Sequence, residues 1–313
     1  MPRTLSSSLV LSATAYLFKP FLRLGLKNVQ VNGLPFLLDA LRERPEGRKG
    51  VVTVCNHNSV MDDPLAWCTM PMSTFFPFAS PTTTSRNSRW TLGARDIMFT
   101  NSAFSKFFEL GQVISTERGG GIFQPAIDQA IQLLQNGEWI HIFPEGKVNQ
   151  KSSNPEGGLL RFKWGIGRIV MDSEIMPDII PMWISGFDQV MPEPRNFPRF
   201  LPRPGGSISI NFGPPLTPRI RPLVEAWKDI ASKQSGTVGV GGRWEEPSPS
   251  GPSGETQRLI RSQGRLANGQ EEAVRIEITQ ALQEGVRELG EQVEREEGRY
   301  ERGEWCQSRR RIQ

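Results

Sequence analysis

The sequence contains very few of the residues that hold metal ions or form disulfides. Two histidines and three cysteines occur among its 313 residues. The cysteines, Cys55, Cys68 and Cys306, are too few and too widely spaced for a disulfide framework or a metal cage. These shortages predict that the protein has no metal site and is not a small disulfide-stabilised domain.

Other features of common protein classes are missing as well. No Gly-x-Ser-x-Gly segment occurs, which disfavours a covalent serine hydrolase, and no glycine-rich nucleotide motif follows a predicted strand. The net charge of +4 is too weak to indicate a nucleic-acid partner. A mean hydropathy of −0.38, with 37% hydrophobic residues, excludes a polytopic membrane protein.

The sequence also lacks a long uninterrupted apolar run near its N-terminus. Residues 5–18 are mostly apolar, but serines and Thr14 interrupt them and Pro20 follows. A membrane span needs about 20 apolar residues, so this stretch is too short. Apolar residues recur at helical spacing at Leu5, Leu9, Ala13 and Leu17. This spacing predicts a helix within residues 1–27 that lies in a membrane interface.

Charge supports that prediction without deciding it. The first 30 residues contain no acidic side chain, and their charged residues are Arg3, Lys19, Arg23 and Lys27. A basic, serine-containing start is also typical of a mitochondrial presequence. A helix packed on the core of the domain is the third possibility.

A second uncharged stretch, residues 64–85, is long enough to cross a bilayer but contains four prolines. Each proline removes a backbone donor and clashes with the preceding turn, which forbids a continuous helix. Its aromatic residues would suit the headgroup region of a membrane. A loop packed on the core explains the stretch equally well.

Strand and helix patterns alternate through the middle of the chain. The predicted strands are residues 51–56, 112–115, 139–143, 178–184 and 207–212. The predicted helices are residues 101–110, 123–135, 160–171 and 219–231. This alternation predicts one α/β domain, which we place at residues 28–232.

The composition changes after this domain. Residues 233–270 are rich in glycine, serine and proline, which predicts a disordered insertion. Residues 271–313 begin with a strong amphipathic helix and end in a tail. Its apolar positions, at steps of four and three, are Val274, Ile278, Leu282, Val286, Leu289 and Val293. We expect this helix to pack on the domain or on a membrane.

One histidine lies beside two acids, in the segment CNHNSVMDDP (55–64). A histidine with a nearby carboxylate can act as a general base, because the acid fixes the tautomer and stabilises the imidazolium. His57 and Asp62 can meet only if His57 precedes a helix that begins near Asp62. This places His57 at the carboxyl end of a buried strand, where α/β sheets bind ligands. A loop histidine without catalytic function is the alternative, and Asp63 is a second acid within reach.

Two further segments carry charged residues next to glycine. Arg118, with Gly119 and the two glycines that follow, can offer a guanidinium and backbone N–H groups to a phosphate. Glu145, Gly146 and Lys147 follow the predicted strand 139–143, so Glu145 can accept a hydrogen bond from a substrate hydroxyl and Lys147 can reach an anionic head group. Each segment can equally be an ordinary turn with solvated charges. The second histidine, His141, lies inside that strand and is predicted to be buried and structural.

These residues together resemble the glycerolipid acyltransferase family. Its four sequence blocks appear here in order as NHNSVMD, ERGG, FPEG and IIPM, and the resemblance covers about residues 5–215. It implies a single mixed-sheet acyltransferase domain flanked by helices. The blocks are most similar to those of enzymes that exchange acyl chains between phospholipids and lysophospholipids.

The resemblance implies a reaction and a set of roles. His57 would be the base and Asp62 its partner, while Arg118, Gly119, Glu145, Gly146 and Lys147 would bind the substrate. The expected reaction is coenzyme-A-independent remodelling of cardiolipin acyl chains, with monolysocardiolipin as favoured acceptor and no metal or cofactor. The expected location is peripheral, on mitochondrial inner or outer membranes facing the intermembrane space. An acyl-CoA-dependent lysophospholipid or lysophosphatidate acyltransferase is the alternative, and a non-enzymatic membrane scaffold is a third reading.

Overall fold

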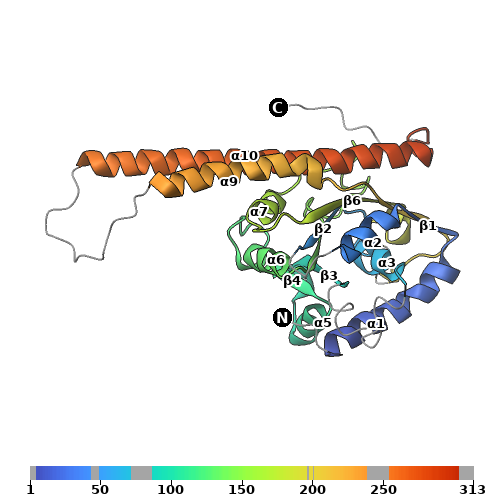
Figure 1. Ribbon diagram of the computed structural model, residues 1–313. Coiled ribbons are helices and arrows are strands. Elements are labelled where there is room, and N and C mark those ends of the chain that lie inside the picture. The colour runs from blue at the N-terminus through green and yellow to red at the C-terminus, as the bar shows by residue number, and fades with distance from the viewer. Residues whose placement is uncertain are drawn as a thin grey trace.

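The computed structural model describes residues 5–43, 49–71, 87–195, 197–199, 201–237 and 254–302, without the side chains of residues 233–268. Its centre is a seven-stranded sheet in the order β1-β7-β6-β2-β5-β3-β4 (Figure 1). The strands are β1 (Asn28–Asn32), β2 (Val51–Cys55), β3 (Arg89–Ala94), β4 (Val113–Thr116), β5 (Trp139–Ile142), β6 (Asp178–Ser185) and β7 (Ser207–Phe212).

Strand direction decides where the loops of the sheet gather. Strands β2 to β6 run parallel to one another, whereas β7 is antiparallel to β6 and parallel to β1. The sheet is therefore mixed, as expected. All five residues of β2 are buried, which fits a central parallel strand covered on both faces. The carboxyl ends of β2 to β6 meet at one edge of the sheet, called the carboxyl edge below.

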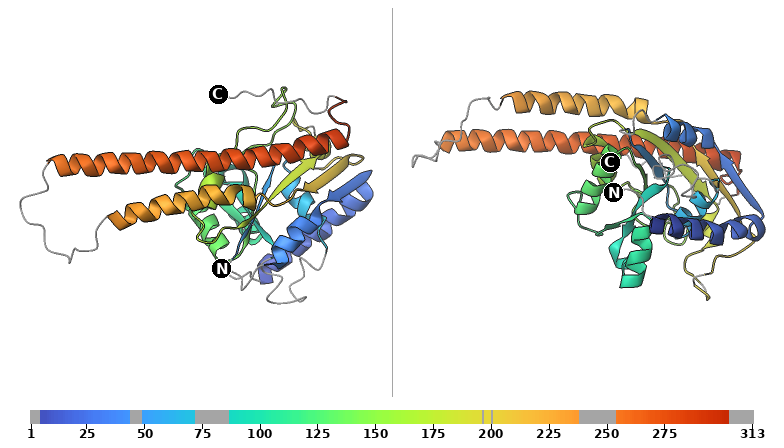
Figure 2. Two further views of the ribbon diagram at one scale, coloured as in Figure 1. Left: turned by 45° about the horizontal axis from the view of Figure 1, so that its top comes forward. Right: turned by 60° about the horizontal axis from the view of Figure 1, so that its bottom comes forward.

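Helices cover both faces of the sheet and one of its ends (Figures 1 and 2). One face carries α1 (Leu5–Pro20), α2 (Leu34–Arg42) and α3 (Asp62–Cys68), and the other carries α6 (Pro125–Gln135), α7 (Gly165–Met171), α9 (Thr217–Thr237) and α10 (Gly254–Glu296). Two short helices, α4 (Arg95–Met98) and α5 (Ser102–Leu110), join β3 to β4, and α8 (Phe187–Val190) follows β6. Each face of the sheet thus has its own hydrophobic core.

Most predicted elements are confirmed, and one helix is wrong at its start. Residues 160–164 were expected to be helical, but α7 begins only at Gly165. The backbone N–H of Leu160 donates to Glu145 and that of Phe162 donates to Gln283. Side chains therefore take the hydrogen bonds that a helix would need. The sequence did not predict β1, α2 and β3, nor the one-turn helices α4 and α8.

The C-terminal helix packs on the domain. Ile278, Leu282 and Val286 of α10 are fully buried against the core that also holds Trp183. A Cβ atom on Gly290 would lie 2.5 Å from the Trp183 ring, so glycine permits this close approach. Helix α9 continues to Thr237 and α10 begins at Gly254, so helix enters both ends of the segment predicted to be disordered. Residues 238–253 lie outside the described residues.

The N-terminal helix is longer than the sequence suggested. A π-helical turn (Phe21–Gly25) follows Pro20, and Leu5–Gly25 forms a 21-residue helical segment. Among the described residues it is long and apolar enough to cross a membrane by length and composition, which corrects the expectation that it is too short. One side of it packs on the domain through Leu11 and Ala15, while Leu5, Leu9 and Leu17 are exposed. Of the uncharged stretch 64–85, residues 72–85 lie outside the described residues.

Candidate active site

His57 lies at the carboxyl edge, two residues after the end of β2. Its Nδ1 atom is 2.8 Å from Oδ2 of Asp62, the first residue of α3. Asn56, between the strand and the histidine, is fixed to β6 because its side chain both donates to and accepts from the backbone of Ile184. The predicted arrangement of a strand end, a histidine and a helix start is therefore confirmed.

Asp62, and not Asp63, is the partner of His57. Oδ2 of Asp62 also accepts hydrogen bonds from the backbone N–H groups of Asn58 and Ser59, at 2.6 and 2.8 Å. Complete burial raises the pKa of Asp62, and the contacts with His57 and the backbone oppose that rise. Asp63 instead pairs with Arg89. Burial works against ionisation of Asp63, but the Arg89 guanidinium holds its pKa below the usual value.

The imidazole of His57 presents one nitrogen outward. Because Nδ1 faces Asp62, Nε2 is the nitrogen left to exchange a proton, and the side chain is 22% exposed. The ring stacks on Phe143, with centroids 4.4 Å apart and an interplanar angle of 21°. Phe143 directly follows β5, so two neighbouring parallel strands fix both the position and the tilt of the ring.

Glu145 is placed behind the histidine instead of facing a substrate. It is buried, and Oε1 accepts a hydrogen bond from the backbone N–H of His57 at 2.7 Å. Oε2 accepts from Asn149 and from the backbone of Leu160. Burial raises the pKa of Glu145 to about 7, against the effect of these hydrogen bonds. The structure thus gives Glu145 a different place from the expected acceptor of a substrate hydroxyl.

Asn149 and Gln150, together with Glu145, hold the backbone of the His57 loop, and we call these three residues the clamp. The sequence did not predict a role for Asn149 or Gln150. Asn149 donates its backbone N–H to the carbonyl of His57 at 2.7 Å, while its side chain donates to Glu145 and Gly158. Gln150 donates to the carbonyls of Asn58 and Met191. Asn149 lies four residues after Glu145 of the FPEG block. A buried polar contact of this kind follows no helix or strand periodicity, so the sequence does not predict it.

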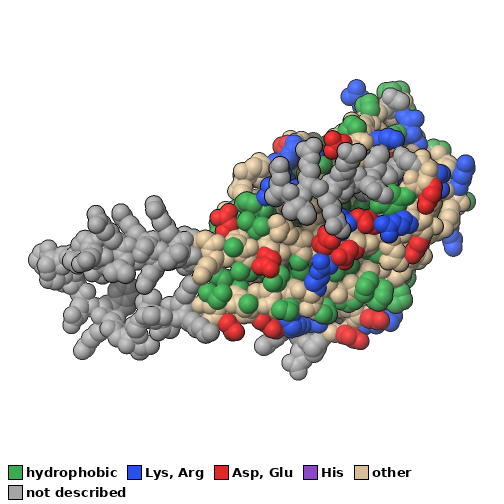
Figure 3. Space-filling view, turned by 90° about the horizontal axis from the view of Figure 1, so that it is seen from above, with side chains coloured by type: hydrophobic (Ala, Val, Ile, Leu, Met, Phe, Trp, Pro, Cys, Tyr) green, Lys and Arg blue, Asp and Glu red, His purple; other side chains and the backbone are tan. Residues whose placement is uncertain are grey.

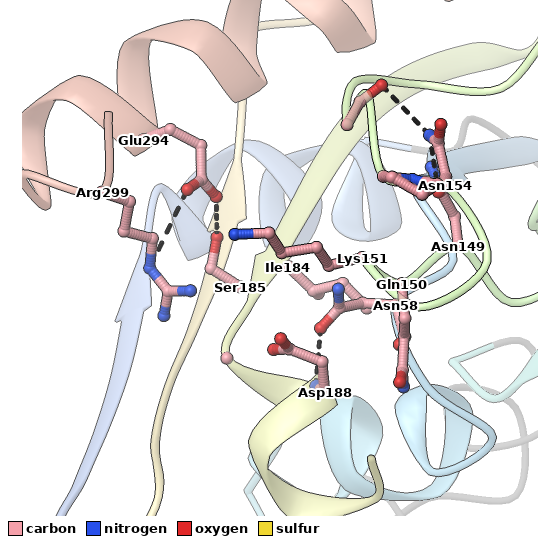
Figure 4. A pocket seen from close by; sticks show the side chains of 13 residues that line it. Asn58, Asn149, Gln150, Lys151, Asn154, Ile184, Ser185, Asp188, Glu294 and Arg299 are labelled. Carbon is pink, nitrogen blue, oxygen red and sulfur yellow. Dashed lines mark hydrogen bonds and ion pairs between the residues drawn. The ribbon is translucent and has the colours of Figure 1, made fainter. Parts of the chain in front are cut away.

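A polar cavity of about 40 Å³ adjoins the clamp (Figure 4). Asn58 lines it from the His57 loop, and Ser185 lines it from the end of β6. Glu294, at the end of α10, accepts hydrogen bonds from Ser185 and Trp183 and pairs with Arg299. The cavity shows that the C-terminal helix reaches the same edge of the sheet as His57.

Arg118 lies at the carboxyl edge, after β4, and is more than half exposed. It forms a two-pronged ion pair with Asp96, which begins the connection after β3. This hydrogen-bonded pairing lowers the pKa of Asp96 and raises that of Arg118. Gly119 has a φ of 82°, a conformation that glycine adopts without strain, so the loop turns sharply beside the guanidinium.

The other residues expected to bind the substrate are not all free to do so. Gly146 also turns with a positive φ, of 71°, and Lys147 beside it is exposed and has no ion pair among the described residues. The N–H of Gly120 bonds to Glu117, so the glycines after Arg118 do not all have free N–H groups, contrary to expectation. The N–H groups of Asn58 and Ser59, next to His57, donate to Asp62.

His141 is structural, as predicted. It is buried, its Nδ1 lies 2.8 Å from Oγ1 of Thr53, and burial lowers its pKa to about 3. It therefore stays neutral at physiological pH. Within the part of the chain that the structure describes, no three His, Cys, Asp or Glu side chains gather in a way that could hold a metal ion.

Comparison with known proteins adds to this geometry. A family model described as "Acyltransferase" matches residues 35–185, the segment that contains His57, Asp62, Arg118 and Glu145. This segment therefore forms an acyltransferase domain.

Similar proteins belong to two named groups. The chain is 34% identical to a taffazin of Dictyostelium discoideum over 61% of this chain and 63% of that protein. It is 36% identical to tafazzin of Drosophila melanogaster over 67% and 51%. It is also 34% identical to an N-acylphosphatidylethanolamine synthase of Arabidopsis thaliana over 62% and 65%. The chain is thus a homologue of the tafazzins, and the matches span about half to two thirds of these relatives.

Among solved structures, the chain is similar to the 1-acyl-sn-glycerophosphate acyltransferase of Thermotoga maritima. The TM-score is 0.45 and the identity 17%, over 76% of this chain and 81% of the other.

Proposed function

We propose that this acyltransferase moves acyl chains between phospholipids and lysophospholipids without coenzyme A, and that it remodels cardiolipin. The observation that carries the proposal is the contact of His57 Nδ1 with the buried carboxylate of Asp62. It fixes the tautomer that leaves Nε2 as a base, at an exposed sheet edge. The similarity to tafazzins supports the choice of reaction.

In the proposed reaction, Nε2 of His57 removes the proton from a hydroxyl of the lysophospholipid. The oxygen attacks the ester carbonyl of a donor phospholipid and forms a tetrahedral intermediate. Collapse of the intermediate breaks the donor ester bond, and the departing alkoxide takes the proton back from the imidazolium. Asp62 stabilises the imidazolium throughout, and a base in this position typically accelerates transfer by about 10²–10⁴-fold.

The head groups of both lipids carry phosphate, and we assign their binding to the exposed cations at the carboxyl edge. Arg118 pairs with Asp96 in solvent, where water and salt weaken such ion pairs. A phosphate can therefore exchange for Asp96. Gly119 and Gly146 provide the turns beside Arg118 and Lys147. In this proposal Glu145 does not touch the substrate but supports the loop of His57.

We place the enzyme on a membrane surface, attached through α1. The residues that gave the amphipathic pattern, Leu5, Leu9 and Leu17, are about two thirds exposed or more, whereas the opposite side of α1 packs on the domain. A helix held in this way lies along a membrane interface more readily than across it. The mitochondrial location facing the intermembrane space is part of the same proposal, and import into isolated mitochondria would test it.

The decisive experiment follows labelled acyl chains in liposomes that contain a phosphatidylcholine donor and a monolysocardiolipin acceptor, without coenzyme A. We expect transfer by the parent chain and a loss of about a thousandfold in His57→Ala. Unfolding and liposome binding of the variant should match the parent. Transfer that requires added acyl-CoA would favour the acyl-CoA-dependent alternative. Transfer to the amine of phosphatidylethanolamine would favour the activity named for the Arabidopsis relative.

A further inference from the structure

Helix α5 and the short α4 before it show a pattern that the proposed reaction does not explain. Helix α5 contains three phenylalanines, yet in the described elements α4 and α5 no side chain is buried. Phe104 is 53% exposed and Phe107 is 47% exposed. They are three positions apart and therefore share one side of the helix. Ile97 on α4 is 62% exposed.

Helix α5 lies against α1, which has exposed apolar residues of its own. The hydroxyl of Ser7 on α1 donates to the carbonyl of Leu110 at the end of α5, at 2.5 Å. Leu5 and Leu9 lie two residues from Ser7, so they point to the side of α1 away from this contact, where they are exposed. Phe107 lies one turn before Leu110. The two helices lie together on the side of the molecule opposite α9 and α10 (Figures 1 and 2). We call the exposed apolar residues of α1, of the turn after it, of α4 and of α5 together the α1–α5 face. They are Leu5, Leu9, Tyr16, Leu17, Leu24, Ile97, Phe104 and Phe107.

Charge distinguishes this face from the opposite one. From Leu5 to Leu38 the chain has no acidic residue, and Arg23 and Lys27 are exposed. Lys106 of α5 is exposed as well and pairs with Glu109 on the same helix. The opposite side, seen in Figure 3, mixes acidic and basic side chains over α9 and α10. Exposed apolar side chains bordered by cations match an anionic lipid surface, with aromatic rings at headgroup depth.

We propose that α5 is a second membrane-interface element, and that the α1–α5 face docks on an anionic lipid bilayer as one surface. The inference rests on the proposed function, in which α1 alone attaches the enzyme to a membrane, and adds α5 as a second helix that contacts the lipid. Helix α4 begins where β3 ends, at the carboxyl edge. A bilayer against α4 and α5 therefore lies beside the same edge as His57, where ester groups of membrane lipids must arrive.

The test compares vesicle binding of chains that all carry His57→Ala, so that no lipid is turned over. Vesicles are an equimolar mixture of phosphatidylcholine and phosphatidylglycerol, and binding is measured by co-sedimentation. We expect Phe104→Ser with Phe107→Ser to weaken partitioning about tenfold or more, because two half-exposed rings lose their apolar contact with lipid. Ile175→Ser is the matched control, since Ile175 is also 44% exposed but follows α7, away from this face. It should bind like its parent.

Two outcomes would overturn the proposal. Undiminished vesicle binding by the double variant would show that α5 does not touch lipid. A lipid-free dimer of the parent that the double variant converts to a monomer, in sedimentation equilibrium, would assign the face to a second copy of the chain. If the double variant does not fold, Ile97→Ser on α4 replaces it with the same expected direction. Since no acyl transfer is measured, failure of the proposed reaction would leave these results standing.

Discussion

Two loops at the carboxyl edge of this sheet differ in how firmly they are held. The loop from His57 to Asp62 is fixed by Glu145, Asn149 and Gln150 through buried hydrogen bonds. The loop that carries Arg118 is held by an exposed ion pair with Asp96. Proton transfer needs a base in one fixed orientation, whereas head groups of different shapes need a cation that can exchange partners. The comparison shows that the loop with the proposed base is held by buried side chains, whereas the loop with the proposed head-group contact is held only at the surface.

The largest effect should come from breaking the rigid loop at its carboxylate. We expect Asp62→Asn to lower kcat by about a hundredfold or more, because an amide cannot stabilise the imidazolium of His57. Liposome acyl exchange measures this loss. Asp63→Asn is the matched control one residue away. It should lower the free energy of unfolding by about 3 kcal/mol, since Arg89 is left unpaired, with kcat of the folded protein nearly unchanged. Equal kcat losses in both variants would argue against the assignment of Asp62.

A smaller effect should follow from loosening the clamp behind His57. We expect Asn149→Ala to reduce the free energy of unfolding by about 2 kcal/mol, because buried groups of Glu145 and Gly158 lose a donor. The histidine should also become less well oriented, with kcat about tenfold lower and KM little changed. Asn154→Ala, whose side chain bonds to Asn149 and not to Glu145, should lower kcat less. A larger effect of Asn154→Ala would show that the loop is held in another way.

For the exposed loop that carries Arg118, we expect a mutation to change substrate binding without changing the stability of the fold. We expect Arg118→Ala to raise KM for the lysophospholipid about fivefold while the unfolding midpoint stays nearly constant, because the Asp96 pair is exposed. Arg95→Ala is a matched variant, since Arg95 is equally exposed and pairs with Glu117. Steady-state kinetics on mixed micelles should show a smaller change in KM for Arg95→Ala. An unchanged KM in Arg118→Ala would make Arg118 structural.

The last expected effect is a pH dependence of stability. The pKa of Glu145 is raised to about 7, so the folded protein keeps a proton there that the unfolded chain has already lost. The contribution of Glu145 to the free energy of unfolding should therefore fall as the pH rises from about 5 to about 8. Urea unfolding of the parent and of Glu145→Gln over this range measures it. The parent should lose stability relative to the variant as the pH rises, and parallel pH profiles would contradict the shift.

Much of the fold was readable because it depends on local patterns. Strand β2 is a short β-branched run between polar residues, and α10 repeats its apolar positions regularly. Elements whose signal comes from tertiary contacts were missed. Strand β3 contains Arg89, Gly93 and alternating burial, and its arginine is tolerated because Asp63 neutralises it. The first turns expected of α7 are absent because Glu145 and Gln283 bind that backbone.

The sequence predicted the contact between His57 and Asp62, but it did not predict that Glu145 supports the backbone of His57. The spacing of His57 and Asp62 allowed only one arrangement, and the structure has it. The role expected of Glu145 was derived from its charge, although its position makes it a buried acceptor behind the histidine. Charge and residue type alone do not tell which way a side chain points.

The sequence by itself determined the α/β class, the position of His57 between a strand end and a helix start, and the amphipathic character of the C-terminal helix, because each rests on residues close together in the chain. Only the tertiary structure decided that Asp62 and not Asp63 meets His57, that Glu145 faces inward, and that α1 lies against α5. These outcomes depend on contacts between residues tens of positions apart. Such contacts form only when the sheet brings the ends of its parallel strands to one edge.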